Sequence, residues 1–303
     1  PRAKPVALAL LVAIGVPDTA DALDERRAGA KASAVIPLGH DDMINAVNLA
    51  VGCYSPLTGF MTEEAYLSVT RDDKLPGGPD WTVPILLPVA EETGTALAEE
   101  ADAVLADETG KPVGVMRVTS LFEIERADSA GHVFGTTDTA HPGVRALGGK
   151  PTRCAGGPIH FLESALPEMR HFRRPAEMRV VLESLDRKDY VAFCTRNICH
   201  LGHEHLHTIS LEIMDVLGIN VITGAGVPGN FLPDVVFDTY EHLMEAYYPE
   251  GRIVLNNLRL PPLFAGPKEA FLQAIVLQNY GFNHFIVGRD HAGAGGFYDN
   301  YAS

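Results

Sequence analysis

The chain has 303 residues, of which 46% are hydrophobic and 21% are charged. This length and composition are typical of a globular protein with two domains, and they exclude a chain that is disordered over most of its length. The formal net charge of −15 disfavours binding to nucleic acids and to anionic membranes, so an anionic substrate would need a locally basic site.

Residues 2–16 (RAKPVALALLVAIGV) place two basic residues ahead of an apolar run, as a secretory signal does. We instead expect a core strand or helix there, because the rest of the chain has the character of a cytoplasmic protein. The four cysteines lack the spacing of a disulfide framework and fit a reducing compartment. No other stretch approaches the roughly 20 apolar residues of a membrane span, so we expect a soluble, cytoplasmic protein.

Residues 1–150 predict a β-rich domain. Short β-forming runs at 81–90 (WTVPILLPVA) and 111–125 (KPVGVMRVTSLFEIE) are separated by Gly, Pro and Asp clusters that mark turns. Residues 151–180 then contain a Gly/Pro-rich stretch that predicts a connector, followed by the start of a helix. We therefore expect the domain boundary near residue 150.

Residues 151–303 alternate between strand and helix patterns. The apolar runs lie at 190–193, 219–223, 252–255 and 284–287. The helical patterns between them lie at about 200–217, 234–248 and 267–280. This alternation predicts a doubly wound, Rossmann-like parallel sheet, and open sheets of this kind bind ligands beyond the carboxyl ends of their strands.

The segment YVAFCTRNICHLGHEHL, residues 190–206, combines a strand with polar groups suited to an anion. Thr195, Arg196 and Asn197 follow the apolar strand at its carboxyl end. His200 and His203, three residues apart, would share one face of the next helix and point toward its N-terminus. A helix N-terminus favours an anion, so we expect phosphate or another oxyanion there.

Three local patterns allow other interpretations. His203-Glu204-His205-Leu206-His207 satisfies the HExxH pattern of zinc hydrolases, but no third ligand follows at a recognisable spacing. Cys194, Cys199, His200 and His203 have the side chains for a tetrahedral metal site, but they lack a CxxC pair. Residues 224–229 (GAGVPG) match the dinucleotide fingerprint GxGxxG, yet Pro228 disfavours the helix that the fingerprint requires.

Several further residues are interpreted as structural. We expect packing or structural roles for His132, His141, His160, His284 and Trp81. Lys268 and Glu269, in the first turn of a helix, are expected to be solvated, although Lys268 is also one of the cations available for a basic site. Arg289 and Asp290 end a strand in the sequence GRDHAGAGG, where basic side chains and glycines favour a phosphate-binding role.

Four ordered segments of the chain resemble one family. They are CYSPLTGFM at 53–61, VFGTTDTAHPGV at 133–144, TRNICHLGHE at 195–204 and AGPKEAFLQAIVLQNYGFNHFIVGRDHAG at 265–293. They resemble the FSPLxGFM, VxGTxDxxHPGV, TRNPxHxxHE and AGPxEA…HFIVGRDHAG segments of the ATP sulfurylases (sulfate adenylyltransferases), which are HxGH nucleotidylyltransferases. The third segment carries the HxGH signature.

The resemblance implies a smaller β-rich PUA-like domain over residues 1–150 and a Rossmann-like adenylyltransferase domain over residues 151–303. It implies transfer of the adenylyl group of ATP to sulfate, with Mg²⁺ bound to the ATP, and we expect a homo-oligomer. The implied catalytic residues are Thr195, Arg196, Asn197, His200, His203 and Arg289. The implied substrate- and nucleotide-binding residues are Cys194, Gly202, Gly288, Asp290, His291, Ala292 and Gly293.

The chain also departs from the family pattern. Cys194 stands where the family has a sulfate-binding glutamine, Ile198 stands for its proline, and Leu263 stands for an arginine. Residues 224–231 (GAGVPGNF) replace a basic KKGD stretch, and relatives continue through a further C-terminal segment. Three hypotheses remain open: a sulfate adenylyltransferase, a relative that acts on another oxyanion or acid, and an inert nucleotide-binding paralogue.

Overall fold

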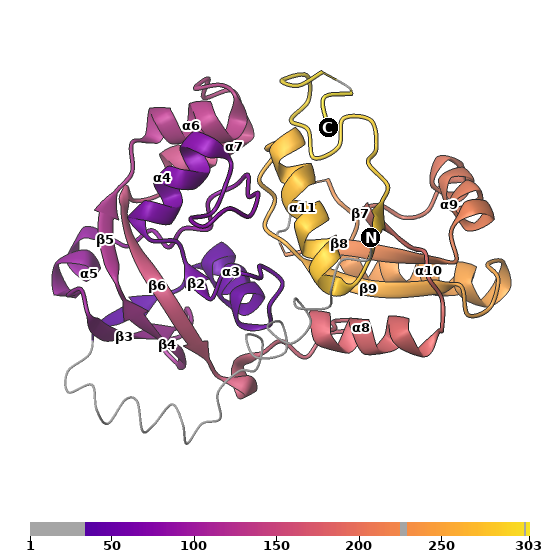
Figure 1. Ribbon diagram of the computed structural model, residues 1–303, viewed down its shortest axis with the longest axis horizontal. Helices are drawn as coiled ribbons and strands as arrows, with labels where there is room; N and C mark the ends of the chain where they lie inside the picture. The colour runs from indigo at the N-terminus through magenta and orange to yellow at the C-terminus, as the bar shows by residue number, and fades with distance from the viewer. Residues whose placement is uncertain (1–33, 225–228, 300) are drawn as a thin grey trace. The chain divides into compact units, whose positions relative to one another are not determined.

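The computed structural model describes residues 34–224, 229–299 and 301–303, and Figure 1 shows the chain from its N-terminus to its C-terminus. The chain divides into two compact units. Unit 1 comprises Pro1–Leu166, Leu263–Gln273 and Gly288–Ser303, and unit 2 comprises Pro167–Pro262 and Ala274–Val287. The signal-like run at 2–16 lies outside the described residues. None of the described helices is long and apolar enough to cross a membrane.

Unit 1 is built on a sheet of six short strands. Five of them follow the order β1-β3-β4-β6-β2, and β5 also pairs with β6. Only the β1–β3 pairing is parallel among these pairs. The strands are β1 (Val35–Pro37), β2 (Gly59–Phe60), β3 (Ala101–Ala106), β4 (Pro112–Val118), β5 (Ser120–Glu123) and β6 (Arg153–Phe161).

Six helices begin in the described part of unit 1, and α6 packs against both α4 and α7. The helices are α3 (His40–Ala50), α4 (Glu63–Asp72), α5 (Glu91–Ala96), α6 (Arg126–Phe134), α7 (Pro142–Gly148) and the beginning of α11 (Pro267–Tyr280), with a 3₁₀ turn at Glu163–Ala165. Trp81 is fully buried beside Tyr54 and its indole N–H donates to the carbonyl of Val83 at 2.7 Å, which confirms its packing role.

Two predictions for the first domain were wrong. Residues 81–90 form no strand, because Pro84 and Pro88 lack the N–H groups that a ladder needs, and only an isolated bridge forms at Pro88. The Gly-rich stretch expected to be a connector is instead the nine-residue strand β6. Its glycines allow close approach of the backbone: a Cβ at Gly157 would lie 2.0 Å from the carbonyl oxygen of Arg117.

Since β6 belongs to the first sheet, unit 1 extends past the expected boundary at residue 150, to Leu166. It also contains two later segments of the chain, so it is the larger of the two units rather than the smaller one.

Unit 2 has the predicted parallel sheet, with strand order β10-β7-β8-β9 and all three pairings parallel. Its strands are β7 (Tyr190–Thr195), β8 (Val216–Thr223), β9 (Ile253–Arg259) and β10 (His284–Phe285). Its helices are α8 (Pro175–Ser184), α9 (Leu201–Ile213), α10 (Pro233–Ala246) and the end of α11.

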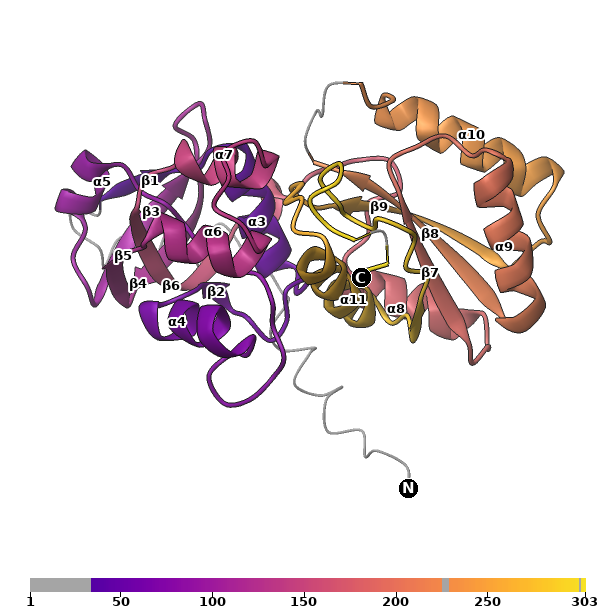
Figure 2. The same ribbon diagram turned by 90° about the horizontal axis from the view of Figure 1, so that it is seen from above.

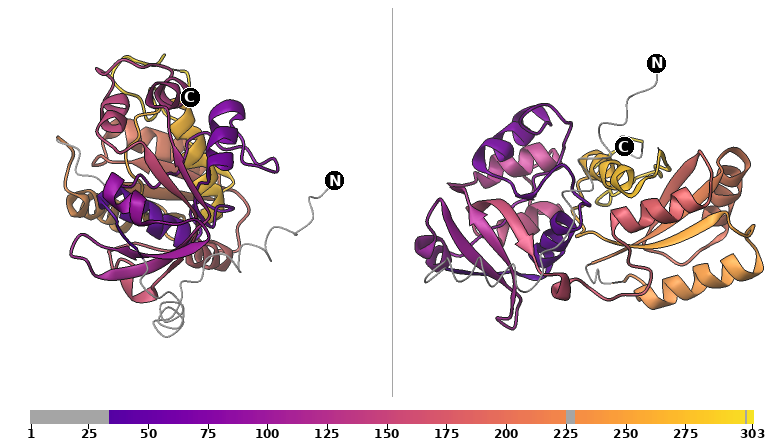
Figure 3. Two further views of the ribbon diagram at one scale, coloured as in Figure 1. Left: turned by 90° about the vertical axis from the view of Figure 1, so that its left-hand side faces the viewer. Right: turned by 60° about the horizontal axis from the view of Figure 1, so that its bottom comes forward.

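The sheet of unit 2 is covered on both faces. Helices α9 and α10 lie on one face, and α8 with the end of α11 lies on the other (Figures 2 and 3). Alternate residues of each strand serve the two faces: Phe193, Ile219 and Leu255 join the core under α9 and α10. On the opposite face Gly218 lies under the ring of Phe282, where a Cβ would come within 2.2 Å of the ring.

Candidate active site

The carboxyl end of β7 is the topological switch point of unit 2. The chain leaves β7 for β8 on one side, and β10 pairs with β7 on the other. The connections on the two sides of β7 therefore diverge, and in open α/β sheets such a point forms the crevice that holds the ligand. The residues expected from the sequence to be functional begin here, with Thr195 as the last residue of β7, and continue to His203.

The turn after β7 is fixed by the buried side chain of Thr195. Its hydroxyl accepts a hydrogen bond from the backbone N–H of Asn197 at 3.0 Å and lies 3.3 Å from the carbonyl oxygen of the same residue. Arg196 is half-buried and the Asn197 side chain is exposed. Thr195 therefore holds the backbone from which a guanidinium and an amide extend past the strand end.

The first turn of α9 is closed by His200. As the N-cap residue, it accepts the backbone N–H of Gly202 on Nδ1 at 3.1 Å, so the proton of the neutral ring lies on Nε2. The His200 ring stacks on the His203 ring with 3.8 Å between the ring centroids and 23° between the planes. A side chain at Gly202 would crowd His200, because an added Cβ would lie 3.1 Å from its ring.

The surroundings of His203 favour the neutral form of its ring. Partial burial lowers the pKa of its imidazole below the ordinary value, and the neighbouring His200 lowers it further. The ring also meets the edge of Phe193 at 5.1 Å between centroids. A neutral imidazole at this position offers an N–H donor rather than a positive charge at pH 7.

One turn further along α9, His207 is fully buried. Its Nδ1 lies 2.7 Å from the hydroxyl of Tyr248, and its ring meets the ring of Phe193 at 4.6 Å between centroids. Burial, and then the nearby His203, lower the pKa of His207 to about 4. The side chain therefore stays uncharged wherever the fold is intact near neutral pH.

This burial predicts a pH-dependent loss of stability. Below pH 6.5 the unfolded chain binds a proton at His207, whereas the folded chain does not bind it until about pH 4. The free energy of unfolding therefore falls as the pH is lowered through that window. Between pH 7.5 and pH 5.0 the contribution is about 2 kcal/mol. We expect the fall in the free energy of unfolding between pH 7.5 and pH 5.0, measured with urea, to be larger by that amount in wild type than in His207→Phe. The exposed His205→Phe is the control and should behave as wild type does.

Far-UV circular dichroism should follow this unfolding, because the single tryptophan, Trp81, lies in unit 1 and does not report on unit 2. An identical pH dependence in wild type and His207→Phe would contradict the assigned burial effect.

Cys194 faces the side of the sheet opposite to Phe193, and therefore opposite to His203. It stands in register with Asn220 on β8, which stands in register with Asn256 on β9. The Asn256 amide donates to the Asn220 side-chain oxygen at 3.0 Å, and both side chains are fully buried. Burial raises the pKa of the Cys194 thiol to about 12, and the charge of Arg196 acts against that shift.

The predicted GRDHAG segment forms a tight loop in unit 1, built on the start of α11. Gly266 donates its backbone N–H to the carbonyl oxygen of Ala292 at 3.0 Å. His291 accepts the N–H of Gly288 on Nδ1 at 3.3 Å, and its Nε2 lies 2.9 Å from the side-chain oxygen of Gln273. Asp290 and Ala292 both have a φ of 53°. Three hydrogen bonds and two residues with positive φ thus define this loop, while the side chains of Arg289 and Asp290 are exposed.

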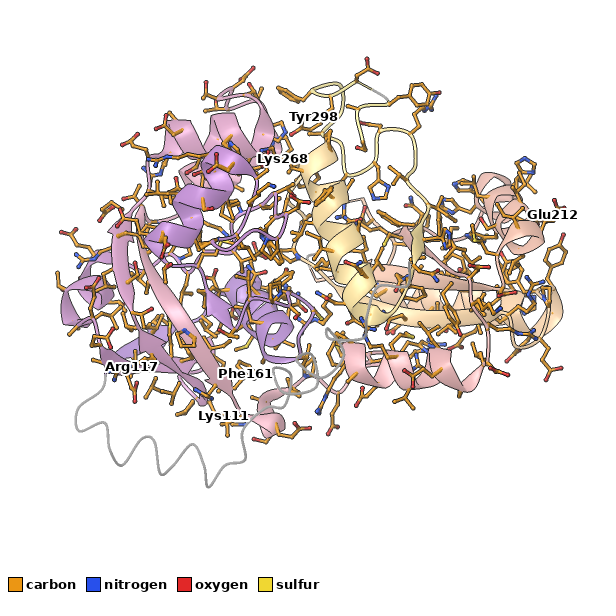
Figure 4. All side chains as sticks on the ribbon, in the orientation of Figure 1. Lys111, Arg117, Phe161, Glu212, Lys268 and Tyr298 are labelled. Atoms are coloured by element: carbon orange, nitrogen blue, oxygen red, sulfur yellow. The ribbon has the colours of Figure 1, made fainter. Side chains whose placement is uncertain are left out.

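The prediction that Lys268 and Glu269 are solvated was wrong. The Lys268 ammonium contacts Asp73 at 2.6 Å and His132 at 2.7 Å, all within unit 1, and Figure 4 shows Lys268 at the first turn of α11. Glu269 is buried and accepts the backbone N–H of Ala265 at 3.2 Å. The charge of Lys268 is therefore partly compensated by Asp73, which makes it a poor candidate for an anion site.

The histidines interpreted as structural have such roles where their contacts are known. His141 is fully buried and caps α7 by accepting the N–H of Gly143 on Nδ1 at 3.1 Å; its Nε2 lies 3.1 Å from the hydroxyl of Tyr298. His284 lies on the edge strand β10, where its Nδ1 lies 2.8 Å from the side-chain oxygen of Asn283.

The alternative interpretations gain no support. In the described part of the chain, no three or more His, Cys, Asp or Glu side chains are grouped to hold a metal. Within HExxH, Tyr248 engages His207 and the Tyr247 hydroxyl donates to Glu204 at 2.7 Å. Most of the GAGVPG segment lies outside the described residues, and α10 begins only at Pro233, so no helix opens at its last glycine.

The sequence interpretation missed His207, Tyr248 and Gln273. The spacing of His203 and His207 was visible, but it was assigned to HExxH rather than to a buried second histidine. Tyr248 and Gln273 carried no local signal, because each meets its histidine partner from a different part of the chain.

Comparison with known proteins found matches over both parts of the chain. A family model described as ATP-sulfurylase matches residues 170–303, and one described as a PUA-like domain matches residues 11–164. Similar proteins include the sulfate adenylyltransferases of Hyperthermus butylicus (40% identity, 85% of this chain and 66% of that protein) and Pyrococcus abyssi (39% identity, 88% and 69%). The chain thus spans about two thirds of the length of these relatives.

A solved structure, the hexameric APS kinase from Thiobacillus denitrificans, superposes with a TM-score of 0.71 at 20% identity, covering 91% of this chain and 51% of that one. At that identity the likeness concerns the fold alone.

Proposed function

This chain belongs to the ATP sulfurylase (sulfate adenylyltransferase) family, and from that membership we propose that it transfers the adenylyl group of ATP to sulfate. An oxygen of sulfate attacks the α-phosphorus of ATP, the bond from that phosphorus to the bridging oxygen breaks, and pyrophosphate leaves. The products are adenosine 5′-phosphosulfate and pyrophosphate. The observation that carries this proposal is the HxGH segment and its TRN turn at the switch point of the parallel sheet in unit 2.

Sulfate is a weak nucleophile and both substrates are anions, so this reaction depends on positioning and on charge stabilisation. In this proposal the guanidinium of Arg196 binds the sulfate, because its planar fork suits an oxyanion. Its positive charge also offsets the repulsion between sulfate and ATP. Thr195 fixes the turn that carries it, and Asn197 donates from its exposed amide to the transferring phosphoryl group. His200 and His203 donate N–H groups to phosphate oxygens as negative charge grows on the leaving pyrophosphate.

The loop from Gly288 to Gly293 is proposed to contribute to nucleotide binding, with Arg289 as its cation. The exposed Arg289 side chain and the backbone held by His291 support this role. Mg²⁺ enters with ATP. Such a magnesium ion takes most of its ligands from phosphates and water, so it needs no cage of protein carboxylates.

Exchange between ATP and radioactive pyrophosphate tests the proposal with purified protein and a panel of acceptors: sulfate, selenate, molybdate and small organic acids. We expect exchange that depends on sulfate. Exchange with organic acids alone would indicate a relative with another acceptor, and ATP binding without any exchange would indicate an inert paralogue. The cytoplasmic location and the homo-oligomeric state stay predictions. Light scattering of the purified protein tests the oligomeric state.

The acceptor is where the chain departs from its family, and Cys194 is the residue to change. A thiol hydrogen-bonds more weakly than the glutamine amide of the family pattern, so an oxyanion beside it has fewer strong donors. If sulfate is the acceptor, Cys194→Gln should preserve or raise the rate of sulfate-dependent exchange. If the acceptor is bulkier or less polar, the same change should lower the native rate and raise the rate with sulfate.

Cys194→Ser is the matched control, because it removes the thiol at the same position without adding the amide of glutamine. An acceptor profile of Cys194→Gln identical to that of wild type would mean that Cys194 does not line the acceptor pocket.

A further inference from the structure

A third imidazole lies behind the two histidines of the HxGH segment. His207 follows His203 by one turn of α9 and is fully buried, whereas His200 is exposed and His203 is half-buried. The three rings thus run from the surface into the core of unit 2, with 3.8 Å between the first two centroids and 6.2 Å between the second and third. In the proposed mechanism His207 does not contact a substrate.

Packing alone does not explain a histidine at this position. Its Nδ1 is engaged by Tyr248, but its Nε2 is buried and has no hydrogen-bond partner among the described residues. An unpaired buried polar atom is unfavourable, and an apolar ring of similar shape would avoid that cost. The polar atom that is used, Nδ1, is therefore the part of the side chain that needs an explanation.

The contacts of His207 lead to both segments of the candidate site. Phe193, whose ring meets both His203 and His207, lies two residues before Thr195 on β7. The hydroxyl of Tyr248 lies 2.7 Å from His207 and 3.8 Å from the sulfur of Cys199, the residue that precedes His200. The pair of His207 and Tyr248 thus supports His203 through Phe193 and the N-cap of α9 through Cys199.

We propose that His207 is a positioning residue: together with Tyr248 it fixes the orientation of His203 and of the first turn of α9. The inference rests on the proposed function, since it concerns how the phosphate-facing histidines are held. His207 touches no substrate and acts through the two aromatic rings beside it. A small displacement of a catalytic group is enough to lower turnover strongly, so loss of this support should appear in kcat.

Three single variants of the full chain test the proposal in the exchange assay. His207→Phe keeps a ring but removes Nδ1, His207→Asn keeps a polar atom near the Nδ1 position, and Tyr248→Phe removes only the partner hydroxyl. We expect His207→Phe and Tyr248→Phe each to lower kcat about 10-fold or more, with the KM for ATP changed less than about 3-fold. The midpoint of thermal unfolding should not fall in His207→Phe, whereas Tyr248→Phe leaves Nδ1 of His207 buried without its partner and should lower the midpoint. His207→Asn should recover kcat to within about 3-fold of wild type.

His205→Phe is the matched control, because His205 is exposed on the same helix and should leave kcat unchanged. The double variant His207→Phe/Tyr248→Phe should be no slower than the slower single variant, since both changes break one interaction. Unchanged kcat in His207→Phe would overturn the proposal. A loss of kcat that follows a loss of thermal stability, without recovery in His207→Asn, would overturn it in favour of a purely structural role.

A second readout separates this inference from the proposed function. If wild type shows no exchange with any acceptor, the function fails, and the ring nitrogen chemical shifts of His203 then test the positioning alone. We expect one tautomer of His203 in wild type and in His207→Asn, and a mixture of tautomers in His207→Phe and Tyr248→Phe. Identical nitrogen shifts of His203 in all four proteins would overturn the positioning role.

Discussion

Arg196→Ala is expected to lower the turnover of sulfate-dependent exchange about 100- to 1,000-fold, which is the loss typical of removing one charge-stabilising donor from an active site. Arg196 is the only arginine of the TRN turn, and it leaves that turn directly after the buried Thr195. Without its guanidinium, sulfate meets the phosphates of ATP with their mutual repulsion uncompensated. Arg196→Lys keeps the charge but loses the planar fork, so we expect an intermediate loss.

Arg187 provides the matched control for this experiment. It is exposed and precedes β7, so one arginine stands near each end of the same strand. Arg187→Ala should leave exchange unchanged. Equal activity of Arg196→Ala and wild type would remove Arg196 from the mechanism and with it the assignment of the acceptor site to the TRN turn.

His203→Ala should lower kcat roughly 100-fold, because one N–H donor to the leaving pyrophosphate is lost. Thermal stability should change little, since the His203 ring is half-buried and other rings surround the vacated space. The lowered pKa of His203 adds a second expectation: kcat of wild type should fall at a lower pH than an ordinary imidazole would dictate, because the His203 ring stays neutral further into the acid range.

His205→Ala is the control for His203→Ala, since it removes an exposed imidazole from the same helix. Full activity in His203→Ala would exclude this histidine from catalysis. If chelators abolished the activity and zinc but not magnesium restored it, the HExxH interpretation would have to replace the adenylyltransferase one.

Unit 2 could be predicted from the sequence because its signals are local. The apolar run beginning at Tyr190 and the runs within β8 and β9 are strands buried on both faces, which appear in sequence as continuous apolar stretches. The helices between them have caps and prolines at their first turns, such as Pro233 in α10. The TRN turn and the N-cap at His200 follow from residues within ten positions of each other, so they too were accessible.

Unit 1 was harder because its signals depend on distant segments. β6 contains Gly156 and Gly157, which a local reading assigns to a loop, and only the approach of Met61 and Arg117 from elsewhere explains them. The ion pair of Lys268 could not be recognised, since its partner Asp73 lies nearly two hundred positions earlier. The division of α11 between the units at Gln273 has no mark in the helical pattern of the sequence.

The strand order of unit 2 also determines at which stage of folding the crevice beside β7 can form. β7, β8 and β9 follow one another in the chain and in the sheet, so they can pair as soon as each has been made. β10 pairs with β7 only after the whole β8–β9 region has been added between them, and such distant pairings form slowly. During synthesis, a growing chain would therefore carry its HxGH histidines on a three-stranded sheet of β7, β8 and β9. The free edge of β7 would be paired last, when the two residues of β10, His284 and Phe285, have been added.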